Sequence, residues 1–156
     1  MGNPIAADAL LAEAAEQSTI SHDEVLELFS GTPLDFPVTF SDSLPFGAHR
    51  FGMVGITLFG RVRLLKRVLD YHPIELLALL RHEAEHVRQQ RKSPILFYPR
   101  YGLSWLISYL NPWPGELLRS LRDTYGRSQG AYRAIPYEVE AYDAGDTMRT
   151  SLRMLV

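Results

Sequence analysis

The sequence contains no cysteine, which excludes disulfide bonds, thiolate nucleophiles and cysteine-ligated zinc. Any bound metal ion must therefore be held by histidine and carboxylate side chains. No apolar run approaches the roughly 18 residues that a membrane-spanning helix needs, and residues 1–6 lack the basic segment of a secretory signal. We therefore expect a cytoplasmic protein with no membrane span.

The first 49 residues also lack lysine and arginine, although they contain eight acidic residues. Residues 50–133 have the opposite bias, with fourteen basic and six acidic residues. A basic segment can bind nucleic acid, but the run Arg61, Arg63, Lys66 and Arg67 lies in no recognisable nucleic-acid-binding module. We expect the two segments to neutralise each other, and we expect no nucleic-acid partner.

The remaining composition is that of one globular domain, with 156 residues, 46% of them hydrophobic and 22% charged. No repeat or linker divides the chain, so residues 1–156 are interpreted as a single domain. The sequence predicts two acidic helices within residues 1–31, and this segment could be an extension or a pro-segment. Even spacing of apolar residues over 52–65 predicts a β-hairpin, and residues 125–134, rich in Gly, Arg and Ser, predict a loop.

Four further segments have helical patterns. The segment 73–92 begins with Pro73 at the first helical position and ends before Ser93-Pro94. Short helices are predicted over 101–110 and 114–118, and a last helix begins at Pro136 and runs to about residue 152. The expected fold class is therefore α+β: a small single domain, mostly helical, in which a β-hairpin precedes the helix at 73–92.

That helix contains His82-Glu83-Ala84-Glu85-His86, an HExxH motif. Histidines four positions apart lie one turn apart on the same face, so both imidazoles can bind one ion, with Glu83 beside a water on that ion. At about 100° per residue the pair lies opposite an apolar stripe. The stripe consists of Leu77, Leu80, Ala84 and Val87. A surface role on a charged helix face is the alternative, but the motif favours Zn²⁺.

A catalytic zinc ion usually has three protein ligands, and the third is expected to be a carboxylate downstream of the motif. His72 is about 15 Å away along the helix, at 1.5 Å per residue, and cannot join the pair. Of the two candidates, Glu138 shares a helical face with apolar residues, whereas Glu140 lies on the polar face. We therefore predict His82, His86 and Glu138 as metal ligands and keep Glu140 as the alternative.

These motifs resemble those of the gluzincins, the zinc metallopeptidases that include thermolysin. The stretch Glu138-Val139-Glu140-Ala141 resembles their Glu-x-x-Ala pattern, in which the first glutamate binds the metal. Residues 50–145 look more specifically like small bacterial proteins of the minigluzincin or DUF4157-like kind, and form a metallopeptidase-like core. The chain departs from the pattern at Tyr142-Asp143, because many gluzincins place there an aspartate that orients a histidine.

The resemblance implies a zincin-like fold and the activity of a zinc-dependent peptidase. Glu83 would be the general base, and the substrate would be a peptide or protein. It also implies that the hairpin edge near residues 54–59 pairs with the substrate backbone. Four side chains could stabilise the oxyanion, and the sequence does not choose between them: Tyr125, Tyr132, Arg133 and Tyr142. The alternative is a catalytically silent or latent zinc domain that binds a protein partner through the aromatic stretch 97–113.

Overall fold

The computed structural model describes residues 3–112 and 114–156 and confirms the α+β class. Four strands form one sheet in the order β1-β2-β4-β3. They are β1 (Ile5–Ala6), β2 (Pro37–Ser41), β3 (Gly55–Leu58) and β4 (Arg61–Leu65). The central pair, β2 and β4, is parallel, and the two outer pairs are antiparallel. Strand β3 is therefore an edge strand of the sheet.

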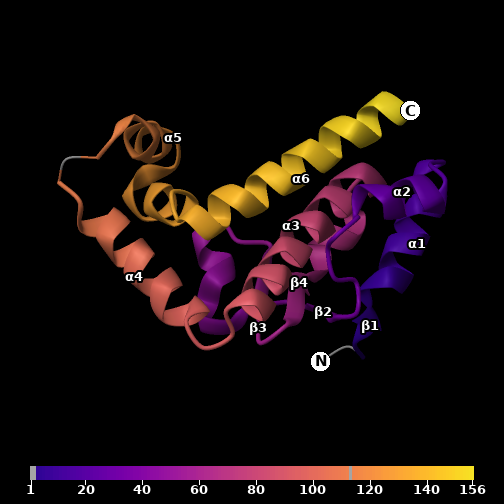
Figure 1. The fold of residues 1–156 in the computed structure, drawn as a ribbon, viewed down its shortest axis with the longest axis horizontal. Coiled ribbons are helices and arrows are strands. Elements are labelled where there is room, and N and C mark those ends of the chain that lie inside the picture. Colours follow the sequence, from indigo (N-terminus) through magenta and orange to yellow (C-terminus); the bar gives the residue numbers. More distant parts are fainter. Residues whose placement is uncertain (1–2, 113) are drawn as a thin grey trace.

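Figure 1 shows how the helices are arranged: α3 packs against the sheet, and α6 packs against α3. Their bounds are α1 (Ala7–Ser18), α2 (His22–Leu28), α3 (Pro73–Lys92), α4 (Phe97–Leu110), α5 (Glu116–Arg133) and α6 (Pro136–Leu155). Two 3₁₀ helices, η1 (Pro45–Phe51) and η2 (Lys66–Asp70), flank the hairpin. The predicted helices at 1–31, 73–92 and from 136 are thus present.

Helix α3 organises the core because it is buried on two sides. Its predicted apolar stripe of Leu77, Leu80, Ala84 and Val87 is almost fully buried and packs in one cluster with α1 and the sheet. The opposite side receives α6 at Gly145, where a β-carbon would lie 3.0 Å from the Ala78 carbonyl oxygen. This close crossing brings the start of α6 over the face of α3 that carries the two histidines.

The predicted hairpin is confirmed as β3 and β4. In β3, however, the evenly spaced apolar residues are not the ones that face the core. Ile56 and Leu58, which helped to define the even spacing, are only half-buried. Gly55 and Thr57 instead lie on the same face as the buried Val62 and point toward α3. The inner face of the edge strand is therefore small and polar, which leaves room for a side chain of α3.

One expectation needs correction, and one strand was not predicted. Residues 125–134 are not a loop: residues 125–133 are the second half of α5, which is broken at Gly126 (φ 80°, ψ 168°), and Ala134 is its C-cap. Gly130 lets the two halves pack closely, since a β-carbon there would come within 2.6 Å of the Arg122 backbone nitrogen. The segment 34–51 contains β2, which was not predicted because its hydrogen-bond partners, β1 and β4, are distant in sequence.

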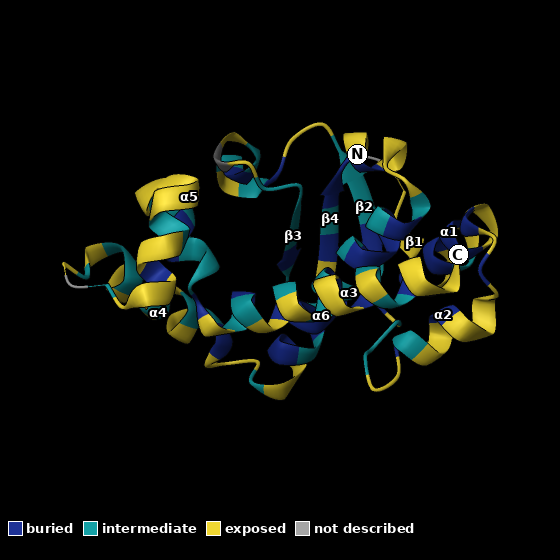
Figure 2. Cartoon of the chain, turned by 90° about the horizontal axis from the view of Figure 1, so that it is seen from above, coloured by how far each residue is buried: buried dark blue, intermediate teal, exposed yellow. Residues whose placement is uncertain are grey.

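Helices α4 and α5 form an arm that extends from the body of the molecule (Figure 1), and much of its surface is exposed (Figure 2). The arm is tied together by Arg122, which donates hydrogen bonds to carbonyl groups at the end of α4. One face of α4 exposes Leu103, Leu106, Ile107 and Leu110. Within the part of the chain that the structure describes, no helix combines the length and hydropathy of a membrane span.

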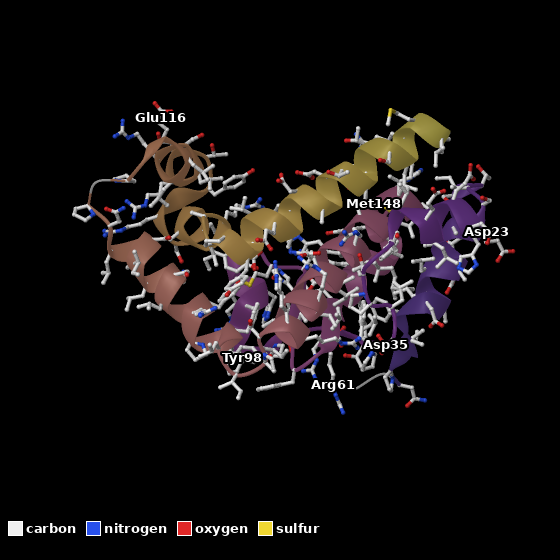
Figure 3. The ribbon with its side chains drawn as sticks, in the orientation of Figure 1. Asp23, Asp35, Arg61, Tyr98, Glu116 and Met148 are labelled. Carbon is white, nitrogen blue, oxygen red and sulfur yellow. The ribbon has the colours of Figure 1, made fainter. Side chains whose placement is uncertain are left out.

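Two ion pairs connect the acidic segment 1–49 to the basic segment 50–133. Lys66 pairs with Asp42 at 2.9 Å, and Arg91 pairs with Asp35 at 2.6 Å. Figure 3 labels Asp35 near α3, and it also shows Arg61 pointing away from the body. Both ion pairs are exposed and so contribute little free energy, but they agree in sign with the expected internal neutralisation.

Candidate metal centre

Three predicted residues meet in the interior although 52 positions separate His86 from Glu138 in the sequence. One ligand atom from each of His82, His86 and Glu138 lies within 4.8 Å of the others. Glu138 Oε1 is 3.2 Å from His86 Nε2, and Glu138 Oε2 is 3.7 Å from His82 Nε2. The two imidazoles come from successive turns of α3, and the carboxylate comes from the first turn of α6. This buried His-His-Glu group could hold a metal ion.

The buried carboxylate has one oxygen without a partner. Glu138 is 1% exposed, and its Oε2 atom accepts no hydrogen bond. Its other oxygen, Oε1, accepts a hydrogen bond from the Tyr101 hydroxyl at 2.5 Å. Leaving a buried carboxylate oxygen unsatisfied is costly, and a cation between Oε2 and the His82 ring would satisfy it. The donor set of two imidazoles and one carboxylate therefore fits a divalent transition-metal ion.

The charges of the group support this interpretation. Burial raises the pKa of Glu138, but His86 and His82 outweigh burial and bring this pKa down to about 2. Burial lowers the pKa of His86, but the Glu138 carboxylate overrides it and raises this pKa to about 9. Burial, reinforced by His86, lowers the pKa of His82 to about 4. At neutral pH the metal-free group is thus an ion pair of Glu138 with His86 beside a neutral His82.

Gln89 fixes the orientation of the His86 ring. Its side-chain amide nitrogen donates to the Tyr137 carbonyl oxygen at 3.0 Å and to Glu140 Oε2 at 3.1 Å. Its oxygen, Oε1, lies 3.0 Å from His86 Nδ1, so that nitrogen must carry the proton it donates. His86 Nε2 is then the atom directed at Glu138, and it is the atom that would bind an ion held by the group.

Glu83 lies beside the histidines and is held by strand β3. The Thr57 hydroxyl donates to Glu83 Oε2 at 2.5 Å. The other oxygen, Oε1, occupies the space that a side chain at residue 55 would fill, because a β-carbon on Gly55 would lie 2.3 Å from it. Burial raises the pKa of Glu83, an effect that His86 and the Thr57 hydrogen bond oppose. A carboxylate whose pKa is raised is suited to both accept and release a proton.

Two adjoining pockets run past Glu83 and form one cleft. The first, of about 350 Å³, extends from His86 and Glu138 and is lined mainly by apolar and aromatic side chains, including Phe97, Tyr98 and Trp105. The second, of about 280 Å³, extends from His82 and contains charged groups. Both pockets are lined by Met53, Gly55, Glu83 and Tyr132. Glu83 therefore lies where the two halves of the cleft meet.

The wall of the apolar half is formed where α4 begins. Figure 3 labels Tyr98 at this end of the helix, close to the turn of the hairpin. The Phe59 backbone N–H donates to the Tyr98 hydroxyl at 2.5 Å, and the two rings are 5.0 Å apart. Gln90 of α3 adds two hydrogen bonds to the same hairpin, at the Thr57 carbonyl oxygen and the Gly60 N–H. The edge strand is thus fixed against α3 beside the cleft.

The structure separates the two candidate glutamates and the four candidate oxyanion donors. Glu140 is largely exposed and reaches the group only through Gln89. Tyr132, Arg133 and Tyr142 line the cleft on the His82 side. Tyr125 is half-exposed and contacts the Arg133 guanidinium instead. Of the histidines outside the motif, His72 caps α3 through the Ile74 N–H, and His49 accepts from the Leu44 N–H.

Several residues of the site have roles that the sequence did not reveal. Gln89 and Tyr101 each form a hydrogen bond to a residue of the His-His-Glu group, and Thr57 forms one to Glu83. Asp143, at the position where the gluzincin pattern departs, is exposed and lies away from the histidines. The helical period would have placed Gln89 one turn after His86, but the elements that carry Thr57 and Tyr101 are placed by tertiary packing alone.

Comparisons of this chain with models of protein families, with curated proteins and with solved structures find no match. The functional interpretation therefore depends on the geometry and chemistry of the site.

Proposed function

We propose that this protein is a zinc-dependent peptidase whose metal is bound by His82, His86 and Glu138. The observation that carries the proposal is the unpartnered Oε2 atom of the buried Glu138, which faces the His82 ring beside a glutamate in a cleft. A purely structural metal site would have no need of a carboxylate such as Glu83 at the junction of two pockets. Two histidines and one glutamate would hold a zinc ion with the three protein ligands that are usual for a catalytic zinc site.

A zinc ion supplies Lewis acidity to the peptide carbonyl and makes water a better nucleophile near neutral pH. Glu83 accepts the proton of the attacking water and delivers it to the leaving amine. Thr57 holds the Glu83 carboxylate in position throughout, because its hydroxyl is the partner of Oε2. Tyr132, which lines both halves of the cleft, is the candidate donor to the oxyanion.

The substrate is proposed to bind as an extended peptide along β3. This strand is at the edge of the sheet and its inner face borders both halves of the cleft. Main-chain hydrogen bonds to an edge strand fix an extended peptide in register, and side-chain pockets then provide selectivity. The apolar half of the cleft, of about 350 Å³, is large enough for an aliphatic or aromatic side chain of the peptide.

The metal content of the purified protein, and its hydrolysis of an unfolded protein followed by mass spectrometry, test the proposal. We expect one zinc ion per chain and loss of cleavage after chelation, with recovery when zinc is restored. Glu83→Gln should retain zinc and lose hydrolysis. Zinc binding without any cleavage by the wild-type chain would contradict the peptidase function.

A second candidate is a latent zinc domain that acts through a protein partner. The exposed aliphatic face of α4, formed by Leu103, Leu106, Ile107 and Leu110, favours it. The aromatic side chains expected to form such a surface mostly do not: Phe97 is buried and Tyr101 faces Glu138, while Trp113 lies outside the described residues. If Ile107→Glu changes the oligomeric state while cleavage is absent, this candidate is favoured over the peptidase.

A further inference from the structure

The pocket on the His82 side of the cleft contains two arginines in different electrostatic situations. Arg149 is compensated, because its Nε lies 2.8 Å from Glu75 Oε2 and a second nitrogen contacts Asp146. Arg133 lines the same pocket, but no carboxylate of residues 3–112 or 114–156 forms an ion pair with it. Its Nε atom is buried and makes no hydrogen bond. Arg133 is thus a cation in a cleft without a counter-ion.

The Arg133 guanidinium is held in place by two tyrosines. Its central carbon lies 4.1 Å from the centre of the Tyr125 ring and 4.4 Å from the centre of the Tyr142 ring. Contacts of this kind use the π faces of the rings and leave N–H groups of the guanidinium available as hydrogen-bond donors. A planar anion such as a carboxylate can therefore bind at the edge without disturbing the stacking.

The position of Arg133 is close enough to the metal centre to contact a bound substrate. The Tyr142 ring is 4.7 Å from the His82 ring, so the Arg133 guanidinium carbon lies at most about 9 Å from the centre of that ring. This separation corresponds to about two to three residues of extended chain. A substrate with its scissile bond at the histidines can therefore place a terminal or side-chain group beside Arg133.

We propose that Arg133 forms a subsite for a carboxylate of the peptide substrate, on the His82 side of the scissile bond. The inference rests on the proposed zinc peptidase and adds the chemistry of its substrate. The two halves of the cleft then have opposite preferences: an apolar side chain binds on the His86 side and an anionic group binds on the His82 side. The carboxylate belongs to the chain terminus or to an acidic side chain of the substrate.

The subsite is tested by binding of small thiols to the cobalt-substituted protein, which needs no catalysis. Mercaptopropionate and propanethiol both bind a metal through sulfur, but only the former has a carboxylate. Their dissociation constants are measured from the visible absorption of cobalt. We expect mercaptopropionate to bind wild-type protein about tenfold more tightly than propanethiol, as a charge-assisted pair provides.

The matched variants are Arg133→Gln and Arg149→Gln. Arg133→Gln should abolish the preference for mercaptopropionate while the propanethiol constant stays the same, which shows that the metal site is intact. Arg149→Gln should keep a preference for mercaptopropionate because Arg133 stays in place, although it leaves Asp146 unpaired in the same pocket. Arg133→Lys retains the charge and should keep part of the preference even if the stacking is weakened, so a folding defect of the glutamine variant does not decide the result.

Three results would overturn the inference. Equal affinity of wild-type protein for the two thiols removes the subsite, and a preference that survives in Arg133→Gln assigns it elsewhere. Neither of these two results contradicts the proposed metal centre. Failure of the wild-type chain to bind cobalt contradicts the proposed function together with the inference. The source of the carboxylate is determined with peptides: amidation of the C-terminus lowers cleavage if the terminus binds, and Glu-to-Gln replacement lowers it if a side chain binds.

Discussion

Gly55 on β3 and Glu83 on α3 lie so close together that a β-carbon on Gly55 would be 2.3 Å from Glu83 Oε1. The same hypothetical atom would lie 2.8 Å from Leu64 Cδ2, on the neighbouring strand. The absence of a side chain at residue 55 is therefore what allows the carboxylate of Glu83 to lie at the junction of the two pockets.

The variant Gly55→Ala is expected to displace Glu83 while the metal remains bound. A misplacement of about 1 Å in a reacting group can cost about 100-fold in rate, so we expect a decrease of that order in kcat/KM with an unchanged zinc content. Gly102→Ala is the matched control, since a β-carbon there meets no atom within 4 Å. Unaltered hydrolysis by Gly55→Ala would show that Glu83 is not the base.

The two glutamates of the Glu-x-Glu stretch should differ sharply in their effect on metal binding. Glu138 is buried against both histidines, whereas the Glu140 side chain is 59% exposed. We expect Glu138→Ala to weaken zinc binding by more than about 100-fold and Glu140→Ala by less than about tenfold. Competition with a chromogenic chelator measures both constants, and the reverse ranking would move the ligand to Glu140.

Gln89 should control metal affinity without being a ligand. Gln89→Met removes the acceptor for His86 Nδ1, and we expect zinc affinity to fall about 10- to 100-fold, as for other residues that orient a metal ligand. Gln89→Glu keeps an oxygen at this position and should retain most of the affinity. If both variants lose affinity equally, the two hydrogen bonds of the amide nitrogen, and not the contact with His86, hold the site together.

Metal binding should release one proton at neutral pH. His86 has a pKa of about 9 in the metal-free protein because Glu138 outweighs its burial, so it is protonated at pH 7 and must lose that proton to bind a metal. His82, with a pKa of about 4, is already neutral. The zinc association constant should therefore rise about tenfold per pH unit between these two values.

Calorimetry in buffers of different ionisation enthalpy counts the released proton directly. Glu138→Gln provides the control, because without the carboxylate the pKa of His86 should fall and the proton release at neutral pH should become smaller. A wild-type chain that binds zinc without releasing a proton would contradict the assignment of His86 as the charged partner of Glu138.

Much of the site could be predicted from local sequence because it depends on the geometry of single helices. The period of α3 places His82 and His86 on one face and Leu77 and Leu80 on the other, and both faces are found as predicted. The period of α6 likewise separates the buried Glu138 from the exposed Glu140. These relationships hold in any fold that keeps the two helices.

Where prediction failed, the deciding contacts were distant in sequence. The glycine-rich segment 125–134 is typical of a loop, yet Gly130 serves a close contact inside α5. Strand β2 gains its hydrogen bonds from β1 and β4, which both lie outside the segment 34–51. Local propensity is weak compared with such tertiary contacts.

The sequence by itself determined the residue types available to a metal, through the absence of cysteine and the spacing of the HExxH motif. Only the tertiary structure decided that α6 crosses α3 at Gly145 and delivers Glu138 to the histidines, and that β3 presents Gly55 and Thr57 to Glu83. The physical reason is that helical and strand periods act over a few residues, whereas convergence of three elements depends on how their buried faces pack.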